Sequence, residues 1–244
     1  MIIAIDGPGG AGKTTMAKEI ARRLSIVYID TGAMYRAVAY AVLQRGLSTT
    51  EETQVVLVLN QIDIRILHNL QKEQVVLLND IDISDKIRTP EVSIGASNVS
   101  KFKQVRLKMV EIQRTISKDT NVVLDGRDIG TFVFPNADFK FFLTASEEIR
   151  AKRRYLELTE KGVETTYESC YNDLRYRDKN DSQREFAPLK AAEDAILVDT
   201  GDLTIDEVIE KLLLKISKSH PISENPSISE NPSISEELKI SENP

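Results

Sequence analysis

The residues best suited to chemistry stand near the start of the chain, where glycines precede a lysine and a threonine. Residues 7–14 read GPGGAGKT, which fits the pattern G-x-x-x-x-G-K-[ST] between an apolar run at 2–5 and a helical pattern. There the glycines let successive backbone N–H groups turn toward phosphate oxygens, and the helix adds its positive end. We expect Lys13 to contact the β- and γ-phosphates of a nucleoside triphosphate and Thr14 to bind Mg²⁺.

A carboxylate at the end of a second apolar run is the other candidate metal ligand. Residues 122–125 read VVLD, so Asp125 would follow a buried strand. An aspartate in that position can hold Mg²⁺ or its water beside a triphosphate. The alternative is that Asp125 only caps a turn, because four such residues are common.

Arginines in or beside polar, glycine-containing loops form the third group. They are Arg36, Arg88, Arg106, Arg127, Arg177 and Arg184. Guanidinium groups match phosphate oxygens in pairs, so several of them favour an acceptor that itself carries a phosphate. A solvated surface charge is the alternative for each. The sequence has neither an N-K-x-D segment nor an LSGGQ segment, which argues against a GTP switch and an ABC-type ATPase.

The elements that would bring these residues together follow an α/β pattern. Apolar runs predict five parallel strands at 2–5, 26–29, 122–125, 139–143 and 195–198, with helices at 14–24, around 35–42, along 90–117 and at 204–216. Short alternating runs within 63–88 predict an inserted antiparallel β lobe. We expect a P-loop NTPase-type parallel five-stranded sheet flanked by helices, with this lobe inserted in it.

Composition limits the class of protein. The 244 residues are 41% apolar, enough for a full core, and no stretch reaches the ~18–20 apolar residues of a membrane span. The start lacks the features of a secretory signal, and one cysteine, Cys170, excludes an internal disulfide framework. A net charge of −6 disfavours nucleic-acid binding. We expect a cytoplasmic monomer without membrane or nucleic-acid partners, and a packed, unreactive Cys170.

The last 25 residues differ from the rest. Residues 222–244 repeat the hexapeptide ISENPS with variations, and one isoleucine per repeat cannot bury enough surface to offset chain entropy. We therefore expect one folded domain at 1–219 and a flexible tail at 220–244. His68 and His220 are placed in a turn and at the tail junction, and neither is expected to be catalytic.

Residues 1–219 resemble the bacterial cytidylate (CMP/dCMP) kinases, which are P-loop nucleoside monophosphate kinases. The resemblance rests on IDGPGGAGKTT at 5–15, DTGAMYR at 30–36, IRTPEV at 87–92, the stretch from Ser97 to Arg106, DGRDIGTFVFP at 125–135 and RDKNDSQR at 177–184. The first segment is shared with many families. The combination of DTGAMYR with DGRDIGT is much more specific.

The resemblance implies roles for individual residues. Thr31, a serine in most relatives, would offer its hydroxyl to the monophosphate, with Tyr35 packed nearby. Arg36, Arg127 and Arg184 would hold the acceptor phosphate and, with Lys13, carry the catalysis. Ser97, Arg106 and Asp128 would read cytosine, and Arg177 and Asp181 the ribose. The implied ATP-binding residues are Gly7, Pro8, Gly9, Gly10, Ala11, Gly12, Lys13, Thr14, Thr15 and Arg154.

Two segments would move or enclose the substrates in such a family member. The insert at about 63–88 would bind the monophosphate, and a lid at about 150–182 would close over the triphosphate. Arg150, Arg153 and Arg154 have helical spacing and would share one face of that lid. Lys179, Asn180 and Ser182 depart from a segment that in relatives is often richer in arginine.

The implied reaction is transfer of phosphate from ATP to CMP or dCMP, giving CDP or dCDP in pyrimidine nucleotide metabolism, by direct in-line displacement with Mg²⁺. Two other hypotheses stay open. One is a kinase for another small acceptor, such as UMP or a shikimate-like alcohol. The other is a nucleotide-binding regulatory protein without turnover.

Overall fold

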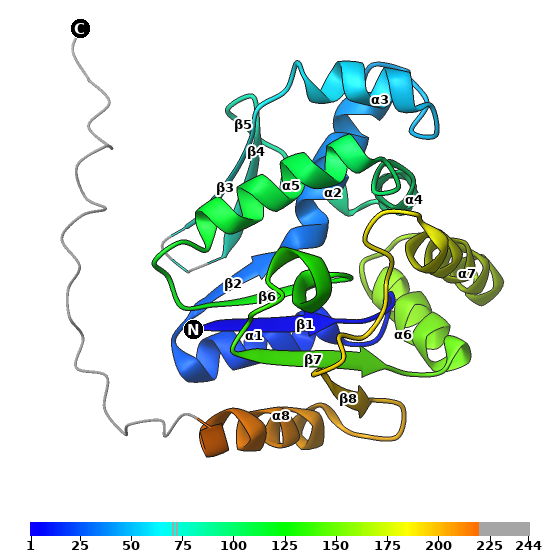
Figure 1. Ribbon diagram of the computed structural model, residues 1–244. Helices are drawn as coiled ribbons and strands as arrows, with labels where there is room; N and C mark the ends of the chain where they lie inside the picture. The colour runs from blue at the N-terminus through cyan, green and yellow to red at the C-terminus, as the bar shows by residue number, and fades with distance from the viewer. Residues whose placement is uncertain (70, 72, 220–244) are drawn as a thin grey trace, which may run out of the picture.

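The computed structural model describes residues 1–69, 71 and 73–219 (Figure 1). The predicted tail at 220–244 lies outside the described residues. Within them, no helix combines the length and the apolar character needed to cross a membrane.

The described chain has a central sheet of five parallel strands in the order β2-β6-β1-β7-β8. The strands are β1 (Ile2–Asp6), β2 (Val27–Asp30), β6 (Val122–Gly126), β7 (Phe139–Thr144) and β8 (Ile196–Asp199). They are rich in isoleucine, valine and phenylalanine, as is typical of parallel strands covered on both faces. The sequence prediction of the fold class is confirmed, and each predicted strand is correct to within one residue at either end.

Side chains alternate between two apolar layers along the strands. Ile3 and Ile5 pack with α1 (Lys13–Leu24) and α8 (Ile205–Ser219), whereas Ala4 packs on the opposite face. That opposite layer also contains α2 (Thr31–Leu43), α3 (Glu52–Leu59), α4 (Pro90–Val99) and α5 (Lys103–Ile116). Two further helices, α6 (Glu147–Glu160) and α7 (Tyr167–Gln183), pack against each other beside the carboxyl ends of the strands (Figure 1).

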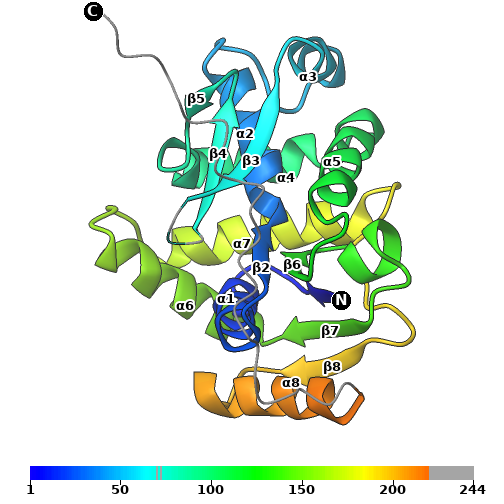
Figure 2. The same cartoon turned by 90° about the vertical axis from the view of Figure 1, so that its left-hand side faces the viewer.

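The predicted insert is a small antiparallel sheet. Its strands within the described residues are β3 (Ile64–His68), β4 (Gln74–Leu78) and β5 (Ile81–Asp82), in that spatial order. Asn79 and Asp80 have positive φ angles of 48° and 66°, which suits the tight turn between β4 and β5. The lobe lies beyond the β2 edge of the central sheet (Figures 1 and 2). His68 ends β3, so its predicted position in a turn was wrong.

The prediction of one helical stretch along 90–117 was also wrong. Phe102 has an extended backbone with ψ of 124°, so the segment divides into α4 and α5. The Ser100 hydroxyl donates to the Ser97 carbonyl, satisfying one group at the end of α4. The apolar pattern does change phase between Val99 and Val105, and that signal was overlooked. Helix α3, the 3₁₀ turn Lys86–Arg88 and the π-helical turn Ile129–Val133 were not predicted either.

Candidate active site

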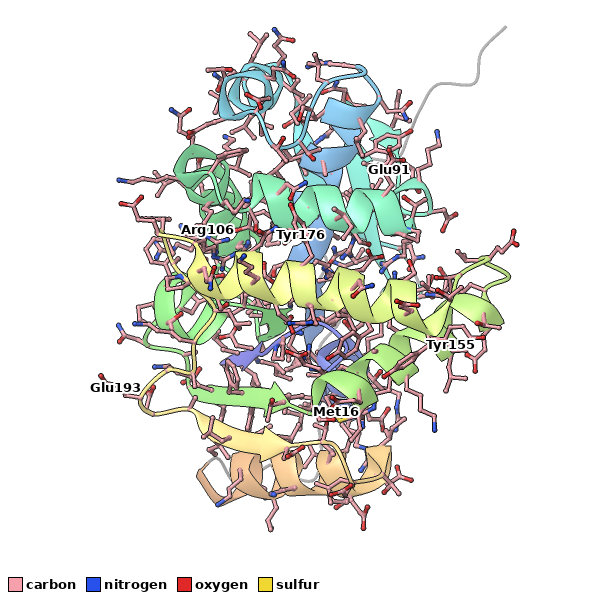
Figure 3. The ribbon with its side chains drawn as sticks, turned by 90° about the vertical axis from the view of Figure 1, so that its right-hand side faces the viewer. Met16, Glu91, Arg106, Tyr155, Tyr176 and Glu193 are labelled. Carbon is pink, nitrogen blue, oxygen red and sulfur yellow. The ribbon has the colours of Figure 1, made fainter. Side chains whose placement is uncertain are left out.

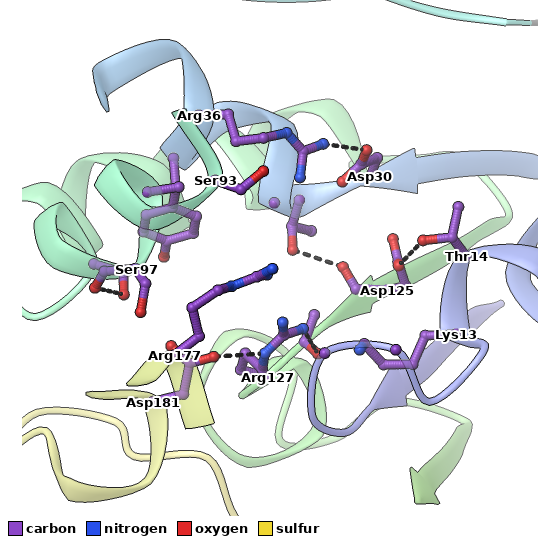
Figure 4. A pocket seen from close by; sticks show the side chains of 18 of the residues that line it. Lys13, Thr14, Asp30, Arg36, Ser93, Ser97, Asp125, Arg127, Arg177 and Asp181 are labelled. Carbon is purple, nitrogen blue, oxygen red and sulfur yellow. Dashed lines mark hydrogen bonds and ion pairs between the residues drawn. The ribbon is translucent and has the colours of Figure 1, made fainter. Parts of the chain in front are cut away.

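A cleft of about 540 Å³ opens at the carboxyl ends of the central strands. Its walls come from the glycine-rich loop, the start of α2, α4, the loop after β6, and the two helices α6 and α7. This is the edge at which parallel α/β sheets usually bind ligands. Figure 4 shows the side chains of Lys13, Arg36, Arg127 and Arg177 pointing into the same space from four separate segments.

The glycine-rich loop has a backbone that larger residues would not allow. Gly10 and Gly12 have φ angles of 75° and 83°, in the left-handed region. A Cβ on Gly7 would lie 2.0 Å from the carbonyl oxygen of Leu143 on the neighbouring strand. The Lys13 ammonium folds back over this loop and donates to the Pro8 carbonyl at 2.7 Å. The loop therefore has the close-packed form that a cradle of backbone N–H groups requires.

Oxygen ligands suited to a divalent cation lie beside Lys13. The Thr14 hydroxyl donates to Asp125 Oδ2 at 2.8 Å, and Tyr28 donates to the other carboxylate oxygen at 2.9 Å. Burial raises the pKa of Asp125, and nearby Asp30 raises it further. A cation between Asp125 and a phosphate would relieve both effects. Hydroxyl and carboxylate oxygens are ligands that Mg²⁺ prefers, so the pair fits such an ion.

Cations crowd together in the middle of the cleft. Burial and the neighbouring Arg127 lower the pKa of Lys13 to about 7. The same two causes lower the pKa of Arg177 to about 10, and its Nε is buried with no hydrogen-bond partner among the described residues. These groups disfavour each other's charged forms until an anion joins them. The electrostatics are those of a polyanion site.

Two aspartates hold arginines that line the cleft, among them Arg36 and Arg127, which the resemblance assigns to the acceptor phosphate. Asp30 pairs with Arg36 at 2.6 Å and with Arg88 at 3.5 Å. Asp181 accepts from Arg127 Nε at 2.8 Å. Each guanidinium keeps further donors for a ligand, because a guanidinium carries five N–H groups.

Farther along the cleft lies the side of the pocket expected to read the base. Arg106 is 1% exposed and pairs with Asp128, and its guanidinium carbon lies 5.3 Å from the centre of the Tyr35 ring. Ser97 of α4 lines the same part of the cleft. Buried polar side chains so arranged select a ligand by its hydrogen-bonding pattern.

Helix α7 closes this side of the cleft through an amide and hydroxyl network. Tyr176 extends toward α4 and donates to Asn98 Oδ1 at 2.8 Å (Figure 3). Asn180 donates to Ser97 Oγ and Asn98 Oδ1, each at 3.3 Å. Asn180 therefore links α7 to the helix that carries Ser97, where an arginine would have placed another charge.

The structure brings together most of the site residues predicted from the sequence. Those lining the cleft are Gly9, Gly10, Gly12, Lys13, Thr14, Thr15, Thr31, Tyr35, Arg36, Ser97, Arg106, Asp125, Arg127, Asp128, Arg154, Arg177 and Asp181. Gly7, Pro8 and Ala11 belong to the same glycine-rich loop but are not among the residues that line the cleft. Arg184 lies behind the cleft: its side chain is 1% exposed, and its Nη2 is 3.7 Å from Asp128 Oδ1.

The three lid arginines do not share one role. Arg150 is buried and donates to the Gly9 carbonyl and Asp178, so it supports the glycine-rich loop from outside the cleft. Arg153 is bound to Thr200, while Arg154 is held by Glu157, and both arginines line the cleft. The prediction that all three close over the triphosphate from one face is wrong for Arg150.

Several lining residues were given no role from the sequence. They are Asp30, Gly32, Ser93, Ala96, Ser100, Gly126, Glu157 and Leu174. Asp30 stands inside the DTGAMYR segment. Arg88, predicted only as one of the group of phosphate-binding arginines, stands inside IRTPEV and also lines the cleft. An acidic residue six positions before an arginine was the available signal for the Asp30–Arg36 pair.

Asp6, at the end of β1, joins the glycine-rich loop to the loop after β6. Its carboxylate accepts from the backbone N–H groups of Ile129 at 2.8 Å and Gly130 at 2.7 Å. Burial raises its pKa to about 7; the two N–H groups and Lys13 oppose this rise, and Asp128 adds to it.

This shift predicts a pH dependence of stability. Between the ordinary pKa near 3.8 and about 7, folded Asp6 keeps a proton that the unfolded chain releases. The stability from this group is therefore lost as pH rises through that window, by on the order of 4 kcal/mol. We expect the wild type to lose stability relative to Asp6→Asn between pH 5 and 8 in urea unfolding. A relative gain over that range would contradict the assignment.

Comparison with known proteins gives consistent matches over nearly all of the described chain. The sequence model of the family described as "Cytidylate kinase" matches residues 3–218. The chain is 51% identical over 211 residues to a cytidylate kinase of Caldicellulosiruptor saccharolyticus, covering 86% of this chain and 93% of that protein. It is 50% identical over 217 residues to that of Clostridioides difficile (89% and 98%) and 47% identical over 211 residues to that of Bacillus subtilis (86% and 95%).

Proposed function

Because this chain belongs to the cytidylate kinase family and is thus a nucleoside monophosphate kinase, we propose that it transfers the γ-phosphoryl group of ATP directly to CMP and dCMP. The observation that carries the proposal is the convergence of Lys13, Arg36, Arg127 and Arg177 on one cleft beside the glycine-rich loop. A cleft with this charge suits two phosphate-bearing ligands placed end to end. The expected products are ADP with CDP or dCDP.

The residues that follow β1 and β6 bind different parts of the phosphate donor, ATP with its Mg²⁺. The glycine-rich loop and Lys13 hold the β- and γ-phosphates through N–H donors and one point charge. The Thr14 hydroxyl and the Asp125 carboxylate, whose oxygens are 2.8 Å apart, would hold Mg²⁺ directly or through its water. When bound, the ion would supply positive charge beside the phosphate oxygens.

Cytosine rather than uracil fits the acceptor end of the cleft. Cytosine presents an amine at position 4, and O2 and N3 as acceptors. Arg106 donates to the two acceptors while the amine donates to Asp128 or Ser97. Uracil presents a carbonyl at position 4, which would face the Asp128 carboxylate without a proton between them.

The chemistry needs no general base and no covalent enzyme intermediate. The acceptor phosphate is already ionised at neutral pH, so its oxygen is the nucleophile. The side chains orient the substrates and stabilise charge. Arg36 and Arg127 orient the acceptor phosphate, and the Lys13 ammonium stays in contact with the phosphoryl group during its transfer. Closure of α6 and α7 over the cleft excludes water, which would otherwise divert the reaction to ATP hydrolysis.

Direct in-line transfer predicts one stereochemical outcome. With ATP made chiral at the γ-phosphorus by oxygen isotopes, CDP should carry that phosphoryl group with inverted configuration, because a single displacement inverts phosphorus. Nuclear magnetic resonance of the labelled product measures the configuration. Retention would indicate two displacements through a phosphorylated side chain, and inorganic phosphate in place of CDP would indicate hydrolysis.

A further inference from the structure

Strand β2 has one edge that no other strand covers in the described part of the chain. It pairs with β6 on one side, where the Val27 N–H donates to the Asn121 carbonyl at 3.0 Å. Backbone groups alternate in direction along a strand, so those of Tyr28 and Asp30 face outward. Such an edge leaves donors and acceptors that need partners.

Two side chains of the inserted lobe satisfy these outward groups. His68 Nε2 lies 3.0 Å from the Tyr28 carbonyl. Gln74 Oε1 accepts from the Asp30 N–H at 2.8 Å, and its Nε2 donates to the Asp30 carbonyl at 3.1 Å. His68 and Gln74 are opposite each other in the β3–β4 register. Because a primary amide has the donor and acceptor of a peptide group, Gln74 takes the place of a neighbouring strand.

The residue held in this way pairs with two arginines that line the cleft. The Asp30 side chain caps α2 by accepting from Ala33 N–H at 3.1 Å, and it pairs with Arg36 and Arg88. Fixing both backbone groups of Asp30 fixes the direction of its carboxylate. Both guanidinium groups are then oriented before any ligand arrives.

We propose that Gln74 is a positioning residue for the acceptor phosphate, acting through Asp30, and that it couples the inserted lobe to the acceptor site. The proposal rests on the proposed function, since it assumes that Arg36 and Arg88 meet a monophosphate. It assigns the lobe a role that does not require any of its own strands to contact the substrate.

Two substitutions at Gln74 test its two hydrogen bonds with the Asp30 backbone. Gln74→Leu removes both hydrogen bonds, whereas Gln74→Glu keeps the acceptor for the Asp30 N–H and sets a carboxylate against the Asp30 carbonyl. Both should raise the KM for CMP about tenfold and leave the KM for ATP within twofold. Gln61→Glu, an exposed change to the same charge close to the lobe, is the matched control and should behave as wild type.

A double-variant cycle tests the route through Asp30. In an Asp30→Ala background, Gln74→Leu should raise the KM for CMP by less than twofold, because the side chain it positions is gone. Additive effects would overturn the proposal. So would an unchanged KM for CMP in both Gln74 variants, or an equal rise in the KM for ATP, which would mean a general structural role.

Amide hydrogen exchange keeps this test separate from the proposed function. Without ligand, the Asp30 amide of Gln74→Leu should exchange faster than the Asp30 amide of the wild type. Failure of the wild type to phosphorylate CMP would overturn the proposed function, and with it the acceptor role, even if exchange at Asp30 responds. Normal wild-type activity with unchanged exchange and KM values in the variant would overturn the Gln74 proposal alone.

Discussion

Replacing Lys13 by methionine is expected to lower kcat about 10³-fold or more. Methionine keeps most of the side-chain volume but removes the charge that, in the proposed mechanism, stabilises the phosphoryl group in the transition state. A loss of that size corresponds to about 4 kcal/mol of transition-state stabilisation. The measurement is ADP release at saturating ATP and CMP. Lys18→Met, at an exposed position on the same helix, is the matched control and should retain activity.

The same substitution should stabilise the protein without ligand. Burial and Arg127 lower the pKa of Lys13 to about 7, so its charged form is disfavoured in the empty site. The melting temperature of Lys13→Met should therefore exceed that of wild type, while the increase in melting temperature on adding ATP should shrink. A kcat within tenfold of wild type would contradict the role assigned to Lys13.

Replacing Arg106 by methionine is expected to raise the KM for CMP about 100-fold and leave the KM for ATP within about twofold. In the proposed binding mode the variant loses two hydrogen bonds from a charged donor to the base, each worth about 1.5–3 kcal/mol when buried, so 100-fold is the lower end of the expected range. Steady-state kinetics with each substrate varied in turn measures the two effects separately. Lys108→Met removes an exposed positive charge from the same helix and should change neither KM.

A second variant tests the same role in case Arg106→Met does not fold. Arg106→Met also leaves Asp128 buried without its main partner, which costs about 3–5 kcal/mol of stability. Ser97→Ala keeps the Arg106–Asp128 pair and loses only the weak 3.3 Å hydrogen bond from Asn180, so its stability should fall by only about 1 kcal/mol, while its KM for CMP should rise about tenfold. Equal effects on CMP and ATP in both variants would show that these residues do not read the base.

Local signals account for what the sequence predicted well. The glycine-rich loop is contiguous, and its backbone follows from glycines at fixed spacing. The central strands are buried on both faces, so they appear as uninterrupted apolar runs. Residues such as Thr31, Arg127 and Asp128 line the cleft because they closely follow strands whose carboxyl ends share an edge.

Most errors and omissions at the site involve contacts between distant segments. Nothing near Arg150 in the sequence indicates that it would bind the Gly9 carbonyl, 141 residues away. The burial of Arg184 behind the cleft depends on the packing of α7. The hydrogen bonds of Gln74 with the Asp30 backbone depend on how the inserted lobe packs against the central sheet. The break between α4 and α5 lacks the glycine or proline that commonly marks one, so only a phase change in the apolar pattern was visible.

The most direct test of the central claim is a comparison of phosphate acceptors. ADP release would be measured with CMP, dCMP, UMP and shikimate under the same ATP and Mg²⁺ concentrations, and CDP identified by chromatography. We predict that kcat/KM for CMP exceeds that for UMP at least tenfold and that shikimate is not phosphorylated. A kcat/KM for UMP ten times that for CMP, or ATP binding without transfer to any acceptor, would contradict the account.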